Sequence, residues 1–417
     1  MQSRASPVHR TLRGDAPHSG VFENLEGLVD EATASRETLN RTRRRDPRTR
    51  SLDGLRRVPY NTRLPMLEKP ELQDEKIIAC LQDDYGLPAV QIAFLPLGAD
   101  LNTTVYRAAL ADGTPYFVKL RRGAFDEIAV TLPKFLSDQG IAQIIAPLAA
   151  NTGQLWASLG AFTVILYPFV EGRDAYEVVL SERHWRDFGA ALKRLHTAAV
   201  PRELTRRIPQ EAYSPRWRDI VRTFLVRLGD DVFDDPVAAQ LAAFLMAKRD
   251  ETTDLVGRAE RLARALRARS PECVVCHSDV HAANILIDAN DALYIVDWDD
   301  PILAPKERDL MFIGGGQGFI GHTAQAEETL FYAGYGPTQI DPFALAYYRY
   351  ERIIEDIAVY CEQIFLTNEG GEDRERSLQY LASTFLPNRT IEIAYTSDKT
   401  VRDDAGQRWP PARPLEA

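Results

Sequence analysis

The most informative segment of this chain is HSDVHAAN, residues 277–284. Short apolar runs flank it, at 274–276 and 293–296, and both indicate strands. Residues 288–291 lie between them and have the composition of a hairpin turn. Such a hairpin would return Asp297 to a position beside Asn284. We therefore expect Asp279, Asn284 and Asp297 to share one polar site.

The residue types in this segment suit phosphoryl transfer. Magnesium prefers one or two protein oxygens together with phosphate and water, and Asn284 and Asp297 would supply two. Asp279 would then be free to orient an alcohol and accept its proton. An Asp, an Asn five positions later and an Asp after a strand is the order that kinases use.

The histidines of the segment leave a second interpretation open. His277, Asp279 and His281 form an H-x-D-x-H pattern, which offers clustered ligands for a metallohydrolase. The other histidines show no recognisable ligand spacing, so phosphoryl transfer is the interpretation that we favour.

Length and composition favour a globular protein with two or three lobes. The 417 residues exceed one ordinary domain, and the 45% apolar content supports a substantial core. The longest apolar run, residues 161–170, is shorter than the roughly 20 residues needed to cross a bilayer. No signal-peptide pattern opens the sequence. We expect a soluble, cytoplasmic protein with no membrane partner.

Charge is unevenly distributed along the chain. Residues 1–63 contain 13 arginines, no lysine and eight acidic residues, whereas the remainder has 37 basic and 52 acidic residues. An acidic body is expected to repel nucleic acid and attract cationic small molecules. Residues 1–65 lack periodicity, so we predict a disordered Arg-rich extension. A nucleic-acid or targeting arm and a true start at Met66 are the alternatives.

Two of the four cysteines, Cys273 and Cys276, form a C-x-x-C pattern. They lie in an apolar run that indicates a buried strand, and no second such pattern accompanies them. We therefore predict that they belong to the core rather than to a zinc or redox site.

The chain divides into a sheet-rich part at 66–170, a helical part at 171–386 and a polar tail at 387–417. The first part has predicted helices at 71–85 and 124–139 and strands at 90–97, 104–110, 116–120, 154–158 and 162–167. The second begins with a helix that Ser181 can cap. Further helices are predicted at 215–228, 236–248, 250–268, 323–334, 341–366 and 374–385.

From about residue 66 to 386 the chain resembles the aminoglycoside phosphotransferases and their kinase-like relatives. HSDVHAAN matches the family's H-x-D-x-x-x-x-N signature, and IVDW at 295–298 resembles its metal-binding aspartate after a strand. The resemblance implies an α+β, bilobal, protein-kinase-like fold with a small antiparallel-sheet N-lobe and a larger, mainly helical C-lobe. It also implies ATP and Mg²⁺ as cofactors and a small-molecule alcohol as acceptor.

The resemblance implies roles outside the loop as well. Lys119 would contact nucleotide phosphates and Glu127 would be its ion-pair partner. Residues 166–170 would form the interlobe hinge, and 98–104 a hairpin over the phosphates. The nucleotide-binding residues implied in this way are Lys119, Glu127, Thr103, Thr104, Tyr167, Phe169 and Val170. His277 and Asp309 are expected to be structural supports.

Several stretches, including 309–316 and 348–356, look closest to spectinomycin phosphotransferases. This implies a cationic aminoglycoside or aminocyclitol acceptor and a role in antibiotic resistance. The candidate amine partners are Asp299, Asp300, Glu351, Glu355 and Asp356. Two alternatives stay open, a metabolic kinase for a choline- or homoserine-type alcohol or a sugar, and a nucleotide-binding pseudokinase.

Overall fold

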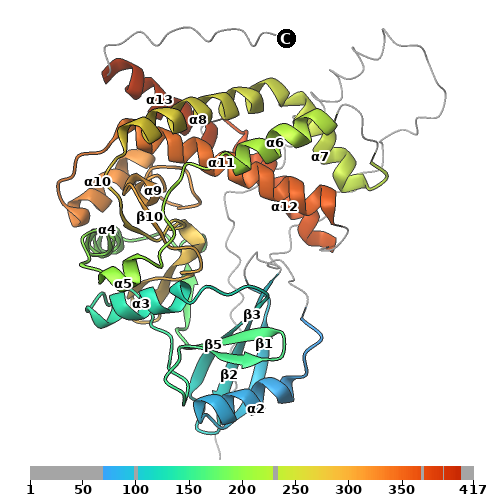
Figure 1. The fold of residues 1–417 in the computed structure, drawn as a ribbon, viewed down its shortest axis with the longest axis vertical. Coiled ribbons are helices and arrows are strands. Elements are labelled where there is room, and N and C mark those ends of the chain that lie inside the picture. Colours follow the sequence, from blue (N-terminus) through green and yellow to red (C-terminus); the bar gives the residue numbers. More distant parts are fainter. Residues whose placement is uncertain (1–68, 98–101, 229–232, 368–370, 388, 405–417) are drawn as a thin grey trace, which may run out of the picture.

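The computed structural model has two lobes, a sheet with one covering helix and a larger helical body (Figure 1). It describes residues 69–97, 102–228, 233–367, 371–387 and 389–404. The predicted extension at 1–65 and residues 98–101 of the phosphate-covering hairpin lie outside the described residues. The small antiparallel-sheet N-lobe and the mainly helical C-lobe confirm the predicted fold class.

The N-lobe sheet is wholly antiparallel, with strand order β1-β2-β3-β5-β4. Its strands are β1 (Ala89–Leu95), β2 (Thr103–Leu110), β3 (Pro115–Arg122), β4 (Ala157–Leu159) and β5 (Phe162–Pro168). Helix α2 (Asp74–Tyr85) buries Ile77, Leu81 and Tyr85 in the same apolar cluster as Val118 and Leu120 of β3. Since side chains alternate along a strand, Lys119 lies on the opposite face of β3.

Helix α3 (Ile128–Asp138) follows the sheet in sequence but packs with the C-lobe. Its apolar residues Ile128, Leu132 and Leu136 join the C-lobe core, not the cluster under α2. Just after the helix, Gln143 accepts a hydrogen bond from the backbone of Ile295 at 2.8 Å. The helix starts later than the predicted residue 124, at Ile128.

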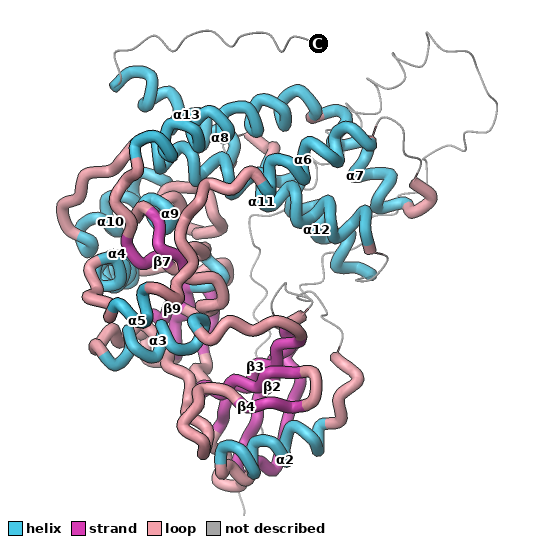
Figure 2. The backbone as a smooth tube through the Cα atoms, viewed as in Figure 1, coloured by secondary structure: helices cyan, strands magenta, loops and turns pink. Residues whose placement is uncertain are grey.

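The C-lobe is a stack of helices around α11, which packs against α6, α8, α12 and α13 (Figure 2). Its helices are α4 (Glu182–His196), α5 (Arg202–Thr205), α6 (Arg216–Arg227), α7 (Pro236–Ala247), α8 (Arg249–Arg269), α9 (Glu307–Leu310), α10 (Ala324–Tyr335), α11 (Pro342–Leu366), α12 (Gly371–Thr384) and α13 (Thr390–Asp404). Ser181 caps α4 as predicted, accepting a hydrogen bond from the His184 backbone at 3.2 Å. No described helix is both long enough and apolar enough to traverse a membrane.

The prediction of a loose tail from residue 387 onward is wrong over 390–404. These residues form α13, whose Ile391 and Ala394 are buried in the C-lobe core. Arg349 of α11 donates a hydrogen bond to Ser397 at 2.7 Å. Most residues of this segment are polar, so its narrow apolar stripe is easily missed in the sequence. That stripe is enough for one face of the helix to pack against the C-lobe core.

Two small sheets hold the segment 277–284 inside the C-lobe. One contains β6 (Gly172–Asp174), β8 (Ile285–Asp288) and β9 (Leu293–Ile295), and the other contains β7 (Val274–Cys276) and β10 (Ile302–Ala304). The segment runs from β7 to β8 and ends in a single 3-10 turn, Ala282–Asn284. Strands β8 and β9 form the predicted hairpin, with Ile285 opposite Ile295.

Candidate active site

The loop between β7 and β8 holds Asp279 by both of its carboxylate oxygens. Arg352 of α11 donates to Oδ1 at 2.7 Å, and His281 and Asn284 lie 3.3 Å from Oδ2. Partial removal from water would raise the pKa of Asp279, but the guanidinium of Arg352, helped by His281, holds it well below its usual range. The carboxylate is therefore ionised and fixed in orientation.

Asp309 of α9 clamps the beginning of the same loop. The fully buried carboxylate accepts backbone hydrogen bonds from His277 at 3.0 Å and Ser278 at 2.7 Å. Ser278 has φ of 76°, which is uncommon for a residue with a side chain. The two hydrogen bonds that Asp309 accepts help to hold this turn. The His277 ring in turn lies 3.0 Å from the Val296 carbonyl and packs on Trp298.

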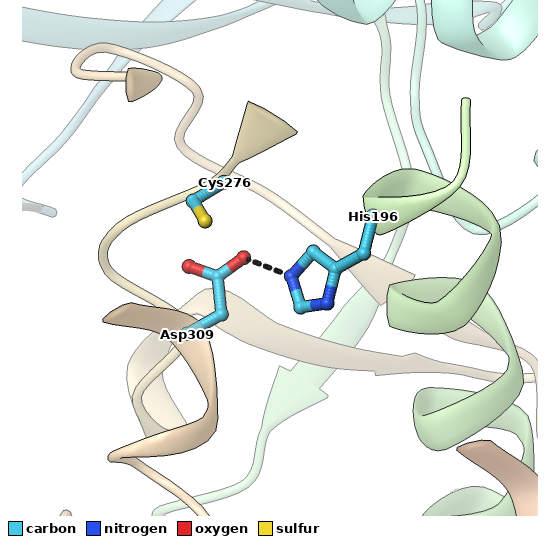
Figure 3. Close-up of side chains that lie close together, drawn as sticks. All are labelled: His196, Cys276 and Asp309. Atoms are coloured by element: carbon cyan, nitrogen blue, oxygen red, sulfur yellow. Dashed lines mark hydrogen bonds and ion pairs between the residues drawn. The ribbon is translucent and has the colours of Figure 1, made fainter. Parts of the chain in front are cut away.

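His196, Cys276 and Asp309 form a buried cluster behind this clamp (Figure 3). The three side chains offer metal-ligand atoms within 4.8 Å of one another. However, His196 already lies 3.0 Å from Asp309 and 2.8 Å from the Tyr335 hydroxyl. Burial raises the pKa of the Cys276 thiol well above its usual range. We interpret the cluster as a structural clamp, which agrees with the predicted core role of Cys276.

The residues predicted to hold a metal lie side by side. The backbone N–H of Val296 donates to the Asn284 carbonyl at 3.0 Å, so Asp297 follows directly beside Asn284. The side-chain nitrogen of Asn284 donates to the Asp279 carbonyl at 2.8 Å, which leaves the Asn284 amide oxygen available. One amide oxygen and one carboxylate are hard oxygen donors, so this pair fits Mg²⁺.

Lys119 reaches across from β3 to the C-lobe. Its ammonium lies 2.9 Å from Asp297 and 2.7 Å from Asp299. Burial would lower the pKa of Lys119, but the two carboxylates raise it above its usual range. The lysine is thus a permanent cation next to the metal donors. Arg121, two residues further along the strand, also contacts Asp299 at 2.7 Å.

The expected Lys119–Glu127 ion pair is not formed in this structure. Glu127 instead pairs with Arg207 at 2.7 Å, while Lys119 binds the two aspartates of the C-lobe. The physical reason is the packing of α3, because its apolar face is buried in the C-lobe core. Glu127 precedes that helix and faces the loop after α5 rather than the sheet.

The two predicted threonines separate onto opposite faces of β2. Thr103 pairs with Arg121 in the register and shares the cleft face with Lys119. Thr104 pairs with Leu120, is buried, and faces the cluster under α2. The Thr104 hydroxyl is therefore not placed to contact a nucleotide in the cleft, which corrects that part of the prediction.

The predicted hinge continues directly from β5. Tyr167 is paired with Phe117, and Pro168 ends the strand opposite Tyr116. Phe169 and Val170 then connect to β6 and the C-lobe, with the Arg107 guanidinium 5.4 Å from the Phe169 ring centre. These residues occupy the crossing between the lobes, where a hinge is expected.

Asp299 and Asp300 lie on the nucleotide side of the site, not at a free acceptor pocket. Asp299 is paired with Lys119 and Arg121, as described above. Both aspartates line a cavity of about 550 Å³ that also contains Glu127 and Arg207. Partial burial and the nearby Asp299 raise the pKa of Asp300. Their expected role as acceptor ligands is not supported by these contacts.

The acidic residues of α11 already have cationic partners. Glu351 is buried against Arg218 at 2.5 Å, so it does not reach the cleft. Asp356 lies 3.2 Å from Arg352, and Glu355 lies 3.8 Å from Arg308. Burial raises the pKa of Asp356 to about 6. Of the predicted amine partners, Glu355 and Asp356 remain near Asp279.

Sequence reasoning missed the arginines of the site. Arg352 and Arg121 each contact a predicted site residue, yet neither stands in a motif with a recognisable spacing. Arg352 belongs to the stretch 348–356 and lies one helical turn before Asp356. Neither the resemblance of that stretch nor the i, i+4 spacing indicated a contact with Asp279.

The fold and the site together define a kinase-type phosphotransferase, and the chain belongs to the phosphotransferase enzyme family, whose model matches residues 93–343. Within that family it is similar to the spectinomycin phosphotransferase APH(9)-Ia, solved with ADP and spectinomycin. The identity is 36%, the TM-score is 0.73, and the match covers 79% of this chain and 100% of that one.

Two other relatives are more distant. Protein StrN of Streptomyces griseus is 27% identical over 238 residues, which are 54% of this chain and 69% of that protein. An aminoglycoside phosphotransferase of Alicyclobacillus acidocaldarius is 16% identical, with a TM-score of 0.54 over 81% of this chain and 98% of that one. The second match shows a shared fold alone.

Proposed function

We propose that the protein transfers the terminal phosphoryl group of ATP to a hydroxyl of a cationic aminocyclitol such as spectinomycin. The observation that carries this proposal is the 36% identity to APH(9)-Ia over the whole of that chain. The site adds support, because Lys119, Asp279, Asn284 and Asp297 meet at one place between the lobes. We expect the enzyme to act in the cytoplasm, where ATP is available.

The nucleotide would lie between the hinge at 167–170 and the face of β3 that carries Lys119. The phosphates of the nucleotide would compete with Asp297 and Asp299 for the ammonium group of Lys119. Asn284 and Asp297 would hold Mg²⁺, which would neutralise charge on the transferring phosphates.

Asp279 would orient the acceptor hydroxyl and accept its proton late, as the bond from the hydroxyl oxygen to phosphorus forms. Its low pKa makes the carboxylate a weak proton acceptor but a permanent hydrogen-bond acceptor. When the phosphoryl-transfer transition state is loose, catalysis depends mainly on positioning the hydroxyl, since little proton transfer is needed before the bond to phosphorus forms. Arg352 and His281 fix the carboxylate for that task.

The direct test is ADP release by the purified full chain with Mg²⁺-ATP. Spectinomycin, other aminoglycosides, choline, homoserine and simple sugars would be compared as acceptors. Turnover with spectinomycin, and growth of a sensitive host on spectinomycin when the gene is expressed, is the expected result. Turnover restricted to a metabolite would assign the chain to the metabolic alternative, and turnover with none would favour the pseudokinase.

A further inference from the structure

An aromatic side chain stands beside the proposed catalytic loop without a function assigned to it. Tyr176 follows β6 in sequence, and its side chain is 48% exposed although it is a large aromatic group. Its ring centre lies 6.3 Å from the ring centre of His281. Because His281 contacts Asp279, the Tyr176 ring is adjacent to the place where an acceptor hydroxyl must arrive.

The backbone around Tyr176 is rigidly attached to the catalytic loop. Ala175 donates to the carbonyls of Ala282 at 3.1 Å and Ile285 at 3.0 Å. The Asp174 side chain accepts a hydrogen bond from the Tyr176 backbone at 2.9 Å. Rigid aromatic side chains are efficient binding groups, since little conformational entropy is lost when a ligand contacts them.

Gly318 provides the surface on which the ring lies. It has φ of 90°, and a methyl group built there would overlap the Tyr176 ring. Its neighbour Gln317 accepts a hydrogen bond from the Ala282 backbone at 3.2 Å. The glycine-rich stretch 314–321 therefore supports both the catalytic loop and the tyrosine.

Two further tyrosines belong to the same region. Tyr360 of α11 and Tyr380 of α12 lie near Tyr176. Burial raises the pKa of Tyr176 and of Tyr360, and the nearby phenol of Tyr380 adds to both shifts. Tyr380 is 60% exposed. Helices α11 and α12 run side by side above the N-lobe in the view of Figure 1. The region thus combines exposed aromatic rings with the carboxylates of α11.

Charged groups of both signs lie in this region. Its carboxylates belong to Asp174, Asp279, Glu355 and Asp356, and the guanidinium groups of Arg308 and Arg352 and the ring of His281 lie among them. An ammonium group over an aromatic face gains about 0.5–2 kcal/mol, more when water is excluded.

We propose that Tyr176 is a specificity-determining residue, whose ring receives the ammonium-bearing part of the acceptor, and that Gly318 is its positioning residue. This rests on the proposed function, since it names how the same site recognises a cationic acceptor. Tyr380 would face the acceptor from α12, and the carboxylates of Glu355 and Asp356 would attract the ammonium group to the same place.

The test is calorimetric binding of spectinomycin to the full chain, without nucleotide, for Tyr176→Leu and Tyr176→Phe. Loss of the aromatic face should weaken spectinomycin binding about 3- to 30-fold, whereas phenylalanine should stay within about twofold of wild type. ATP affinity should be unchanged in both. If Tyr176→Leu binds spectinomycin as tightly as wild type, or wild type does not bind it, the inference is overturned.

A pair of glycine variants tests the positioning role. Gly318→Ala should weaken spectinomycin binding as Tyr176→Leu does. Gly336→Ala is the matched control, because Gly336 has φ of 84° but no atom within 4 Å of an added methyl group. Equal effects of the two would overturn the role of Gly318. Binding that depends on Tyr176 without phosphoryl transfer would refute the proposed function and leave the inference standing.

Discussion

The nucleotide half and the acceptor half of the site neutralise their acidic groups in different ways. In the nucleotide half, Lys119 and Arg121 of the N-lobe contact Asp297 and Asp299 of the C-lobe. In the acceptor half, Arg352 contacts Asp279 from within the same lobe. Separation of the lobes would therefore break the first set of ion pairs and leave the second intact. The nucleotide half depends on lobe closure, whereas the acceptor half is preformed.

The largest effect is expected for Asp279→Asn, in the preformed half. Turnover should fall by roughly 10²–10⁴ because the group that orients the hydroxyl loses its charge. Calorimetric affinity for Mg²⁺-ATP should change less than twofold, since Asp279 does not contact Lys119 in this structure.

The matched control is Asp291→Asn in the turn between β8 and β9. Asp291 has φ of 65°, a conformation that asparagine tolerates, and it lies outside the site. It should retain wild-type turnover. An Asp279→Asn enzyme with wild-type turnover would remove the proposed role and with it the acceptor half as defined here.

In the nucleotide half, Asp297→Asn should weaken ATP binding in the presence of Mg²⁺ by roughly 10- to 100-fold. Asparagine is chosen over alanine because Asp297 has φ of 63°. The reason for the loss is the missing metal-ligand charge. Calorimetry with and without Mg²⁺ separates this from direct nucleotide contact, and an unchanged Mg²⁺ dependence would contradict the assignment.

A substitution of Glu327 tests the glycine-rich stretch 314–321, which supports the catalytic loop and Tyr176. It is 5% exposed and accepts a hydrogen bond from Gly314, where the stretch 314–321 begins, at 3.1 Å. Burial raises the pKa of Glu327 to about 7, from an ordinary value of 4.5. A raised folded-state pKa stabilises the protein fully below about 4.5, and that stabilisation is lost as the pH rises through 7.

Glu327→Gln should therefore raise the free energy of unfolding at pH 8 by about 3 kcal/mol and have little effect at pH 4.5. Glutamine keeps an acceptor for Gly314. Urea unfolding at the two pH values measures the difference. Equal effects at both would show that Glu327 does not titrate in this range. Other groups that titrate between these pH values, such as Asp356 and Glu351, are present in both proteins, so their contribution cancels in the difference between variant and wild type.

The sequence predicted the catalytic loop and the metal donors better than the residues around them for a physical reason. Asp279, Asn284 and Asp297 belong to one loop and one hairpin, so their spacing alone indicates that they meet. Tyr176, Arg352 and Tyr380 come from a turn and two helices, and only packing brings them near Asp279. Glu127 was mispredicted because the burial of α3 in the C-lobe, which redirects that residue, cannot be read from its own periodicity.

The smallest effect, and the sharpest test of the comparison, concerns the pair Arg121–Asp299. The two groups lie 2.7 Å apart and are about one-fifth exposed, so the pair should contribute well under 1 kcal/mol to stability. It nevertheless links the two lobes, between which we propose that the nucleotide binds. Arg121→Gln and Asp299→Asn should each weaken ATP binding about twofold to fivefold. The double variant should bind ATP no more weakly than the single variant with the lower ATP affinity. Spectinomycin binding without nucleotide should be unaffected in all three variants.

Additive losses of ATP affinity in the double variant would show that Arg121 and Asp299 act on the nucleotide separately. A parallel loss of spectinomycin binding would show that the acceptor half also requires the lobes to be closed.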